Sequence, residues 1–209
     1  DDACTYGYLI PSNMFAVTVL GYLEKIERKI YGNGEIAEAA KALKEEVHTA
    51  IETIGKTFTE EFGMVYAYET DGFGMYNLMD DANVPSLLAM NYLGYPSDKE
   101  VEANTRRLLL SEANPFYFKG AKAAGIGSPH TPSNYIWHIA MAVQGLTTGD
   151  REEKRRILEN MAATTGGKGV MHEGFCCEDD TRYTREWFSW ANAMYAELFL
   201  NYLGYTLDK

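Results

Sequence analysis

A short segment near the C-terminus places a carboxylate in a setting suited to acid–base chemistry. Glu173 follows His172 and lies between Gly169 and Gly174, so a ligand could approach the backbone closely there. An aromatic-rich segment that includes Trp187 begins a few residues later. Carboxylates and aromatic rings commonly furnish sugar-cleaving sites. The pattern therefore indicates glycoside hydrolysis, while spacing alone also allows a solvent-exposed loop glutamate.

Glycoside hydrolysis requires a second carboxyl group. An inverting enzyme holds the two groups about 6.5 to 9.5 Å apart, so that a water molecule fits beside the base. Two acidic pairs, Asp1-Asp2 and Asp80-Asp81, are the candidates. Neighbouring carboxylates can raise each other's pKa and retain a proton for general-acid catalysis. The alternative is helix capping, which acidic residues at a helix N-terminus often perform.

Histidine and tryptophan side chains could complete such a site. His130 and His172 fall in irregular segments, from which they could hydrogen-bond sugar hydroxyls. No second His completes a zinc-binding His-Glu-x-x-His pattern, so we expect no catalytic metal and no cofactor. Trp137 and Trp187 could stack on a pyranose ring, although aromatics at helical spacing more often belong to a core. His138, within a predicted helix, is expected to be a satisfied core or rim residue.

The composition argues against several classes of partner. The chain has 209 residues with 30 acidic against 19 basic side chains, a formal net charge of −11. This balance disfavours nucleic acid and suits a neutral substrate better. No apolar run approaches the ~20 residues that span a bilayer, so we expect no membrane partner. Three cysteines, two of them adjacent, form no disulfide or metal pattern, which slightly favours a reducing, cytoplasmic compartment.

Helical periodicity dominates the chain and predicts an all-α fold with small β excursions, in a single region spanning 1–209. A helix capped by Ser12 or Asn13 and a second one after Gly34 should form a hairpin. Asp179 and Asp180 are expected to cap the last helix. Alternation at 64–69 predicts a short hairpin or extended loop. The further helices are expected at 85–93 with Asn83 as cap, 98–112, 133–146, 150–161 and 184–205.

The sequence as a whole resembles glycoside hydrolase family 125. The resemblance covers essentially the whole chain, but family members are considerably longer and carry an additional N-terminal half. Because the chain begins at Asp1 without a Met, we expect it to be a fragment, with any targeting segment upstream. The resemblance rests on five separated motifs in order, at 1–16, 68–74, 79–88, 127–137 and 171–173 with 187–192.

The resemblance implies an (α/α)6 toroid, of which this chain would be the C-terminal portion. It also implies a metal-independent, inverting exo-α-1,6-mannosidase acting on α-mannoside oligosaccharides or glycans. By motif, Glu173 resembles the general base, and Asp1 or Asp2 occupies the position of the general acid. The missing N-terminal half would be a partner, and the isolated chain would be poorly active. We assign to substrate binding Asp80, Asp81, Asn83, His130, His172, Tyr135, Trp137 and Trp187.

Departures from the family pattern lie near the expected site. Gly174 stands where relatives tend to have Ser, His138 where Pro is more usual, and Cys176-Cys177 where residues are more polar. These departures bear on substrate preference more than on reaction class. Helical hairpins by themselves would also permit a different function, that of a non-catalytic carbohydrate-binding or scaffold module.

Overall fold

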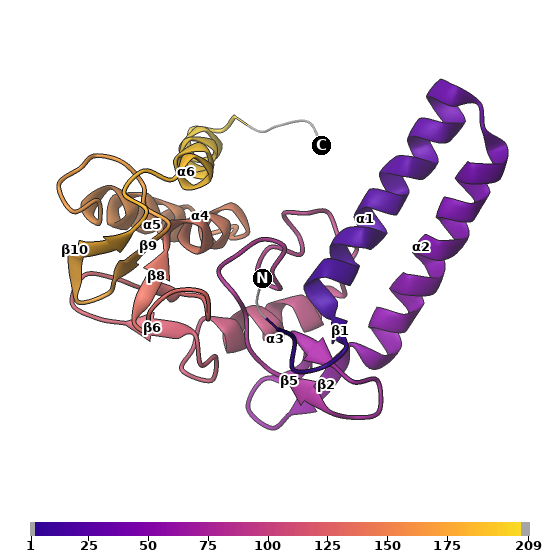
Figure 1. The fold of residues 1–209 in the computed structure, drawn as a ribbon, viewed down its shortest axis with the longest axis horizontal. Coiled ribbons are helices and arrows are strands. Elements are labelled where there is room, and N and C mark those ends of the chain that lie inside the picture. The colour runs from indigo at the N-terminus through magenta and orange to yellow at the C-terminus, as the bar shows by residue number, and fades with distance from the viewer. Residues whose placement is uncertain (1–2, 206–209) are drawn as a thin grey trace. The chain divides into compact units, whose positions relative to one another are not determined.

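The computed structural model describes residues 3–205, which form two compact units. Unit 1 comprises Ala3–Leu78 and Pro85–Arg107, and unit 2 comprises Met79–Val84 and the described residues from Leu108 onward. Both units contain helices and short β-strands (Figure 1). This confirms the prediction of a mostly helical fold with small β excursions.

Unit 1 is built on a helical hairpin. Helix α1 (Ile10–Ile26) continues through the π-helical turn η1 (Glu27–Tyr31), and α2 (Gly34–Ile54) returns beside it (Figure 1). Gly32 ends the first arm with a left-handed φ of 68°, which glycine adopts without steric cost. Asn33 caps α2, because its Oδ1 accepts a hydrogen bond from a backbone N–H in the first turn. The predicted hairpin is confirmed.

The start of α1 differs from the prediction. The cap position is Leu9, and neither Ser12 nor Asn13 precedes the helix. Pro11 lies in the first turn, where its missing N–H costs nothing and its fixed φ favours the helix. Proline at this position therefore outweighs the polar residues that follow it.

Short antiparallel strands form a small sheet and a hairpin in unit 1. Glu69 is buried, and its Oε2 accepts hydrogen bonds from the backbone N–H groups of Thr5 and Tyr6 and from the Asn77 amide. The extended pairing predicted around 64–69 is confirmed. The strands are β1 (Tyr8–Leu9), β4 (Glu69–Thr70) and β5 (Tyr76–Asn77) in one sheet, and β2 (Lys56–Thr59) with β3 (Gly63–Tyr66) in a hairpin.

The helix predicted at 85–93 is wrong. This segment forms consecutive turns, with bonds from Met90 N–H to Leu87 O and from Gly94 N–H to Asn91 O. The Ser86 hydroxyl accepts the Ala89 N–H in the manner of a helix N-cap, but the turns that follow do not continue into an α-helix. The next predicted helix is confirmed as α3 (Lys99–Leu109).

Unit 2 packs three helices beside a three-stranded sheet. Helix α4 contacts both α5 and α6, and the sheet has the order β10-β9-β8 (Figure 1). A separate hairpin pairs β6 with β7. The elements are β6 (Tyr117–Lys119), β7 (Ala124–Ile126), β8 (Tyr135–Trp137), α4 (His138–Leu146), α5 (Arg151–Ala163), β9 (Gly174–Cys176), β10 (Asp179–Thr184) and α6 (Ser189–Tyr202).

Two predicted helices in unit 2 begin later than expected because strands precede them. The first turn predicted for α4 is the buried strand β8, whose aromatic and β-branched residues favour extended structure. The start predicted for α6 is the strand β10. Helix α5 is confirmed, with Asp150 as its cap. No described helix combines the length and apolar character required to cross a bilayer.

The capping role predicted for Asp179 and Asp180 is wrong. Both residues belong to β10. The Asp180 carboxylate lies 2.8 Å from Lys122 Nζ and accepts the Gly166 N–H at 3.0 Å. The hydrogen bond from Lys122 lowers the pKa of Asp180 against the opposing effect of burial. This carboxylate therefore fixes the loop before β9 rather than a helix end.

His138 is a buried core residue, as predicted. Its Nδ1 accepts the backbone N–H of His172 at 3.0 Å, so its Nε2 carries the proton and donates to Thr164 Oγ1 at 3.1 Å. Thr164 in turn donates to the carbonyl of Asn160. Burial lowers the pKa of His138 to about 4. A neutral imidazole with both nitrogens bonded therefore joins α4 to the chain immediately before Glu173.

Unfolding should reveal the proton linkage of His138. The unfolded chain binds a proton at the ordinary pKa of 6.5, whereas the folded state excludes it down to about pH 4. The free energy of unfolding is therefore highest above pH 6.5. It falls by roughly 3 kcal/mol as the pH drops from 6.5 to about 4. In His138→Asn, whose side-chain carbonyl can still accept the His172 N–H, denaturant titrations should show a smaller loss. Equal losses in both proteins would contradict a neutral buried His138.

Candidate active site

Glu173 lies at the end of the sheet in unit 2, next to a cation. Gly174 is in register with Thr184, so the next pair outward joins Glu173 and Arg185. The Glu173 N–H donates to the Arg185 carbonyl at 3.4 Å, and Arg185 Nε lies 3.3 Å from Glu173 Oε1. Glu173 is only 5% exposed. The structure therefore rules out a solvent-exposed loop glutamate and shows a buried, paired carboxyl group.

Trp137 packs on the other side of the same strand. It is in register with Gly174, where an added Cβ would lie 3.0 Å from the indole ring. Its Nε1 donates to Thr131 Oγ1 at 2.9 Å, and its ring meets Phe188 edge-on at 6.4 Å. The ring is buried, which favours the core alternative for most of its surface.

The loop at 127–131 is tied to the acidic pair at 80–81. The Gly127 carbonyl accepts the Ala82 N–H at 3.0 Å, and Ser128 Oγ accepts the His130 N–H at 3.1 Å. A Cβ at Gly127 would lie 2.1 Å from the Tyr135 carbonyl oxygen, so only glycine permits this approach. The loop therefore connects two of the predicted motifs, those at 79–88 and 127–137.

Asp80 and Asp81 are both buried. The Asp80 N–H donates to Asn114 Oδ1 at 3.3 Å, and Asp81 Oδ1 accepts the Asn83 N–H at 3.1 Å in a local turn. No α-helix follows these residues, so the helix-capping alternative is wrong for this pair. Buried carboxyl groups of this kind occur often at functional sites.

His172 is fully buried, with its ring stacked on Tyr183 at 4.0 Å between centroids. Its Nδ1 donates to the Glu186 carbonyl. Its Nε2 is buried and has no hydrogen-bond partner among the described residues. Nε2 is therefore the ring atom whose hydrogen-bonding capacity the described residues leave unused.

Charged groups hold the segment after β10. Glu186 Oε2 accepts the Tyr183 hydroxyl at 2.8 Å and lies 3.0 Å from Lys168 Nζ. The hydrogen bond to this carboxylate raises the pKa of Tyr183, and the bonds from Tyr183 and Lys168 lower that of Glu186.

Within residues 3–205, no group of three His, Cys, Asp or Glu side chains is arranged to hold a metal ion.

The predicted site residues separate into three groups. Buried in unit 2 are Asp80, Asp81, Tyr135, Trp137, His172 and Glu173. Exposed in the same unit are Asn83, His130 and Trp187, the last at 65%. Asp1 and Asp2 lie outside the described residues, so the acid that should face Glu173 stays a prediction.

Arg185 is the site residue that the sequence pattern did not reveal. Its side chain contacts Glu173. Its position depends on the pairing of β9 with β10. Because 184–205 was expected to be helical, this cross-strand pairing was not visible in the sequence.

Known proteins are similar to this chain over nearly its whole length. Residues 1–200 match the family model described as metal-independent alpha-mannosidase (GH125). The meiotically up-regulated gene 157 protein of Schizosaccharomyces pombe is 42% identical over 205 residues, which are 97% of this chain and 40% of that protein.

A solved structure from Streptococcus pneumoniae is similar throughout the chain. It is described as a metal-independent alpha mannosidase in a non-productive substrate complex with alpha-1,6-mannobiose. The identity is 49% and the TM-score 0.95, over 99% of this chain and 49% of that one. The chain thus spans about half the length of this relative, and less of the yeast protein. It belongs to glycoside hydrolase family 125, the metal-independent alpha-mannosidases.

Proposed function

We propose that the protein containing this chain removes non-reducing terminal α-1,6-linked mannose by hydrolysis. The observation that carries this proposal is the match to the Streptococcus pneumoniae protein, whose structure contains alpha-1,6-mannobiose. The buried Glu173 supports it, because glycoside hydrolysis needs a carboxyl group held in a defined place. Membership of a metal-independent family supports a mechanism without a metal.

In the proposed reaction, Glu173 is the general base and Asp1 or Asp2 the general acid. Glu173 takes a proton from a water molecule as the water oxygen attacks the anomeric carbon. The glycosidic C–O bond breaks, and the leaving oxygen takes the proton of the acid. Attack from the face opposite the leaving group inverts the anomeric configuration.

The substrate would be bound by polar and aromatic groups around the base. Buried carboxylates at Asp80 and Asp81 suit sugar hydroxyl donors. Trp187 is exposed and so available to stack on a sugar ring. The other proposed substrate contacts are Asn83, His130, Tyr135, His172 and Trp137.

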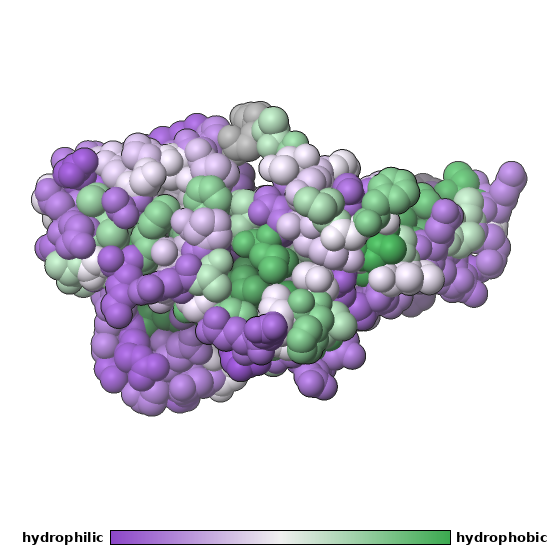
Figure 2. All heavy atoms as spheres, turned by 90° about the horizontal axis from the view of Figure 1, so that it is seen from below, coloured by the Kyte–Doolittle hydropathy of each residue, from purple (hydrophilic) through white to green (hydrophobic). Residues whose placement is uncertain are grey.

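We further propose that the chain is the C-terminal portion of an (α/α)6 toroid, completed by an N-terminal half. Support comes from apolar side chains that unit 1 leaves exposed. Figure 2 shows hydrophobic residues, in green, among hydrophilic ones toward the right-hand end, which α1 and α2 form. Exposed apolar residues on this hairpin are Phe15, Val19, Tyr22, Leu23, Ile26, Ile30, Ile36 and Leu43.

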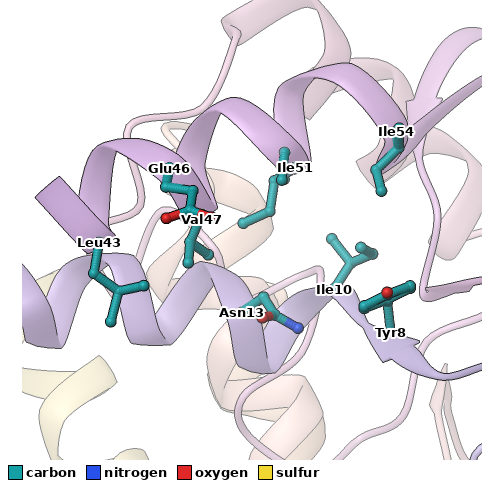
Figure 3. Close-up of a pocket in the computed structure, with 9 residues that line it drawn as sticks. Tyr8, Ile10, Asn13, Leu43, Glu46, Val47, Ile51 and Ile54 are labelled. Atoms are coloured by element: carbon teal, nitrogen blue, oxygen red, sulfur yellow. The ribbon is translucent and has the colours of Figure 1, made fainter. Parts of the chain in front are cut away.

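A groove on the same hairpin would bind part of the N-terminal half. It has a volume of about 270 Å³ and lies between α1 and α2 (Figure 3). Contiguous exposed apolar surface of this kind usually marks an interaction site. The lining residues are Tyr8, Ile10, Asn13, Leu43, Glu46, Val47, Ala50, Ile51 and Ile54.

The direct test of the function is to follow the first-formed sugar. A complete protein containing this segment, incubated with α-1,6-mannobiose, should release β-mannose before mutarotation, observed by NMR. Release of α-mannose first would contradict inversion. Binding of the disaccharide without turnover would favour the non-catalytic sugar-binding alternative.

Removal of the proposed base should stop catalysis without unfolding the protein. Glu173→Gln keeps the shape of the side chain but cannot accept the proton, so kcat should fall by about 100- to 10,000-fold. Glu159→Gln, on the exposed face of α5 where Glu159 pairs with Arg155, should leave kcat unchanged. Steady-state kinetics and thermal unfolding of both variants provide the comparison.

Activated substrates separate the acid from the base. A dinitrophenyl α-mannoside needs no protonation of its leaving group. Whichever of Asp1→Asn and Asp2→Asn removes the acid should therefore recover turnover on this substrate, whereas Glu173→Gln should not. Recovery of Glu173→Gln would contradict its assignment as the base.

The proposed burial of the α1–α2 hairpin by the N-terminal half leads to a prediction about stability. In the complete protein, Leu43→Lys should lower the free energy of unfolding by about 2 kcal/mol, because it places a charge where apolar surface is buried. Lys41→Ala, on another face of α2, should change it by less than about 0.5 kcal/mol. Denaturant titration gives both values. A change at Leu43 as small as that at Lys41 would show that the groove faces solvent.

A further inference from the structure

Arg185 is held against Glu173 by the backbone as well as by its charge. The register of β9 with β10 places the two residues opposite each other, and the Glu173 N–H donates to the Arg185 carbonyl. The side chains then meet on one face, with Nε 3.3 Å from Oε1. The pairing of the strands therefore places the start of the Arg185 side chain next to Glu173.

The backbone of Arg185 is strained. Its φ is 41°, in the left-handed region that favours glycine, and Asn134 is the other described non-glycine residue with positive φ. Strained non-glycine residues cluster at functional sites, where the surrounding structure maintains them. An arginine at this position therefore indicates a role for the side chain.

The surroundings orient the guanidinium group. Its Cζ lies 5.7 Å from the centroid of the Phe188 ring, and the neighbouring Glu186 is paired with Lys168. Glu173 is nearly buried in this ion pair, whereas 61% of the Arg185 side chain is exposed. One end of the cation thus holds the carboxylate, and the rest faces the open side.

We propose that Arg185 is a positioning residue for Glu173, an inference that rests on the proposed function. Arg185 occupies Oε1 and leaves Oε2 as the oxygen that takes the proton from the attacking water. Arg185 itself neither gains nor loses a proton. It fixes the direction from which the base acts and balances a charge that burial would otherwise disfavour.

The test uses Arg185→Gly in the complete protein. Glycine relieves the positive φ and so offsets part of the cost of leaving Glu173 without its cation, and the variant should still fold and unfold in one cooperative transition. With α-1,6-mannobiose, kcat should nevertheless fall by about 100-fold, as expected for a misplaced catalytic group, while KM changes little. Millimolar guanidinium should restore part of kcat, and Arg185→Lys should retain more activity than Arg185→Gly. Arg182→Ala, which removes an exposed arginine from β10, is the matched control and should be fully active.

The outcomes separate this inference from the proposed function. If Glu173→Gln is inactive but Arg185→Gly keeps its kcat, or loses it without any response to guanidinium, the positioning role is wrong and the function stands. If the wild-type protein does not cleave the disaccharide, or Glu173→Gln remains active, the proposed function fails and the role of Arg185 fails with it.

Discussion

The register of the three-stranded sheet in unit 2 is the constraint on which the candidate site depends. Gly174 lies between Trp137 and Thr184 in that register, and a Cβ there would press on both side chains. With the strands fixed in this way, Glu173 must emerge beside Arg185. A shift by one residue would turn the carboxylate to the other face of the sheet. The position of the proposed base is therefore a property of strand pairing.

Two buried ionisable residues, His138 and Glu173, help to fix the segment at this sheet end, and the structure accommodates them differently. His138 is kept neutral by burial and uses both ring nitrogens in hydrogen bonds. Glu173 instead has a guanidinium beside it. Burial of a charge is costly unless the charge is paired. The neutral imidazole secures the peptide before Glu173, and the cation secures its side chain, so the carboxyl group is held from both directions.

The helices of unit 1 show how far periodicity alone could lead. The arms of the α1–α2 hairpin and its Gly32 ending followed from the repeat of apolar residues and from a turn that needs glycine. The same periodicity misled at 85–93, where separate turns replace the helix, and before α4 and α6, where strands end at or beyond the expected helix starts. The apolar repeat along the sequence predicts that a helix is present. It does not reveal where the pairing of neighbouring strands sets the boundary of that helix.

The sequence by itself determined the mostly helical class and the family and singled out Glu173 as the candidate base, because motifs and apolar spacing are local properties of the chain. Only the tertiary structure decided that Glu173 is buried, that Arg185 is its neighbour, and that Asp180 pairs with Lys122. These contacts join residues through strand register and loop packing. Such distances depend on how separated segments meet, and the order of residues along the chain does not contain them.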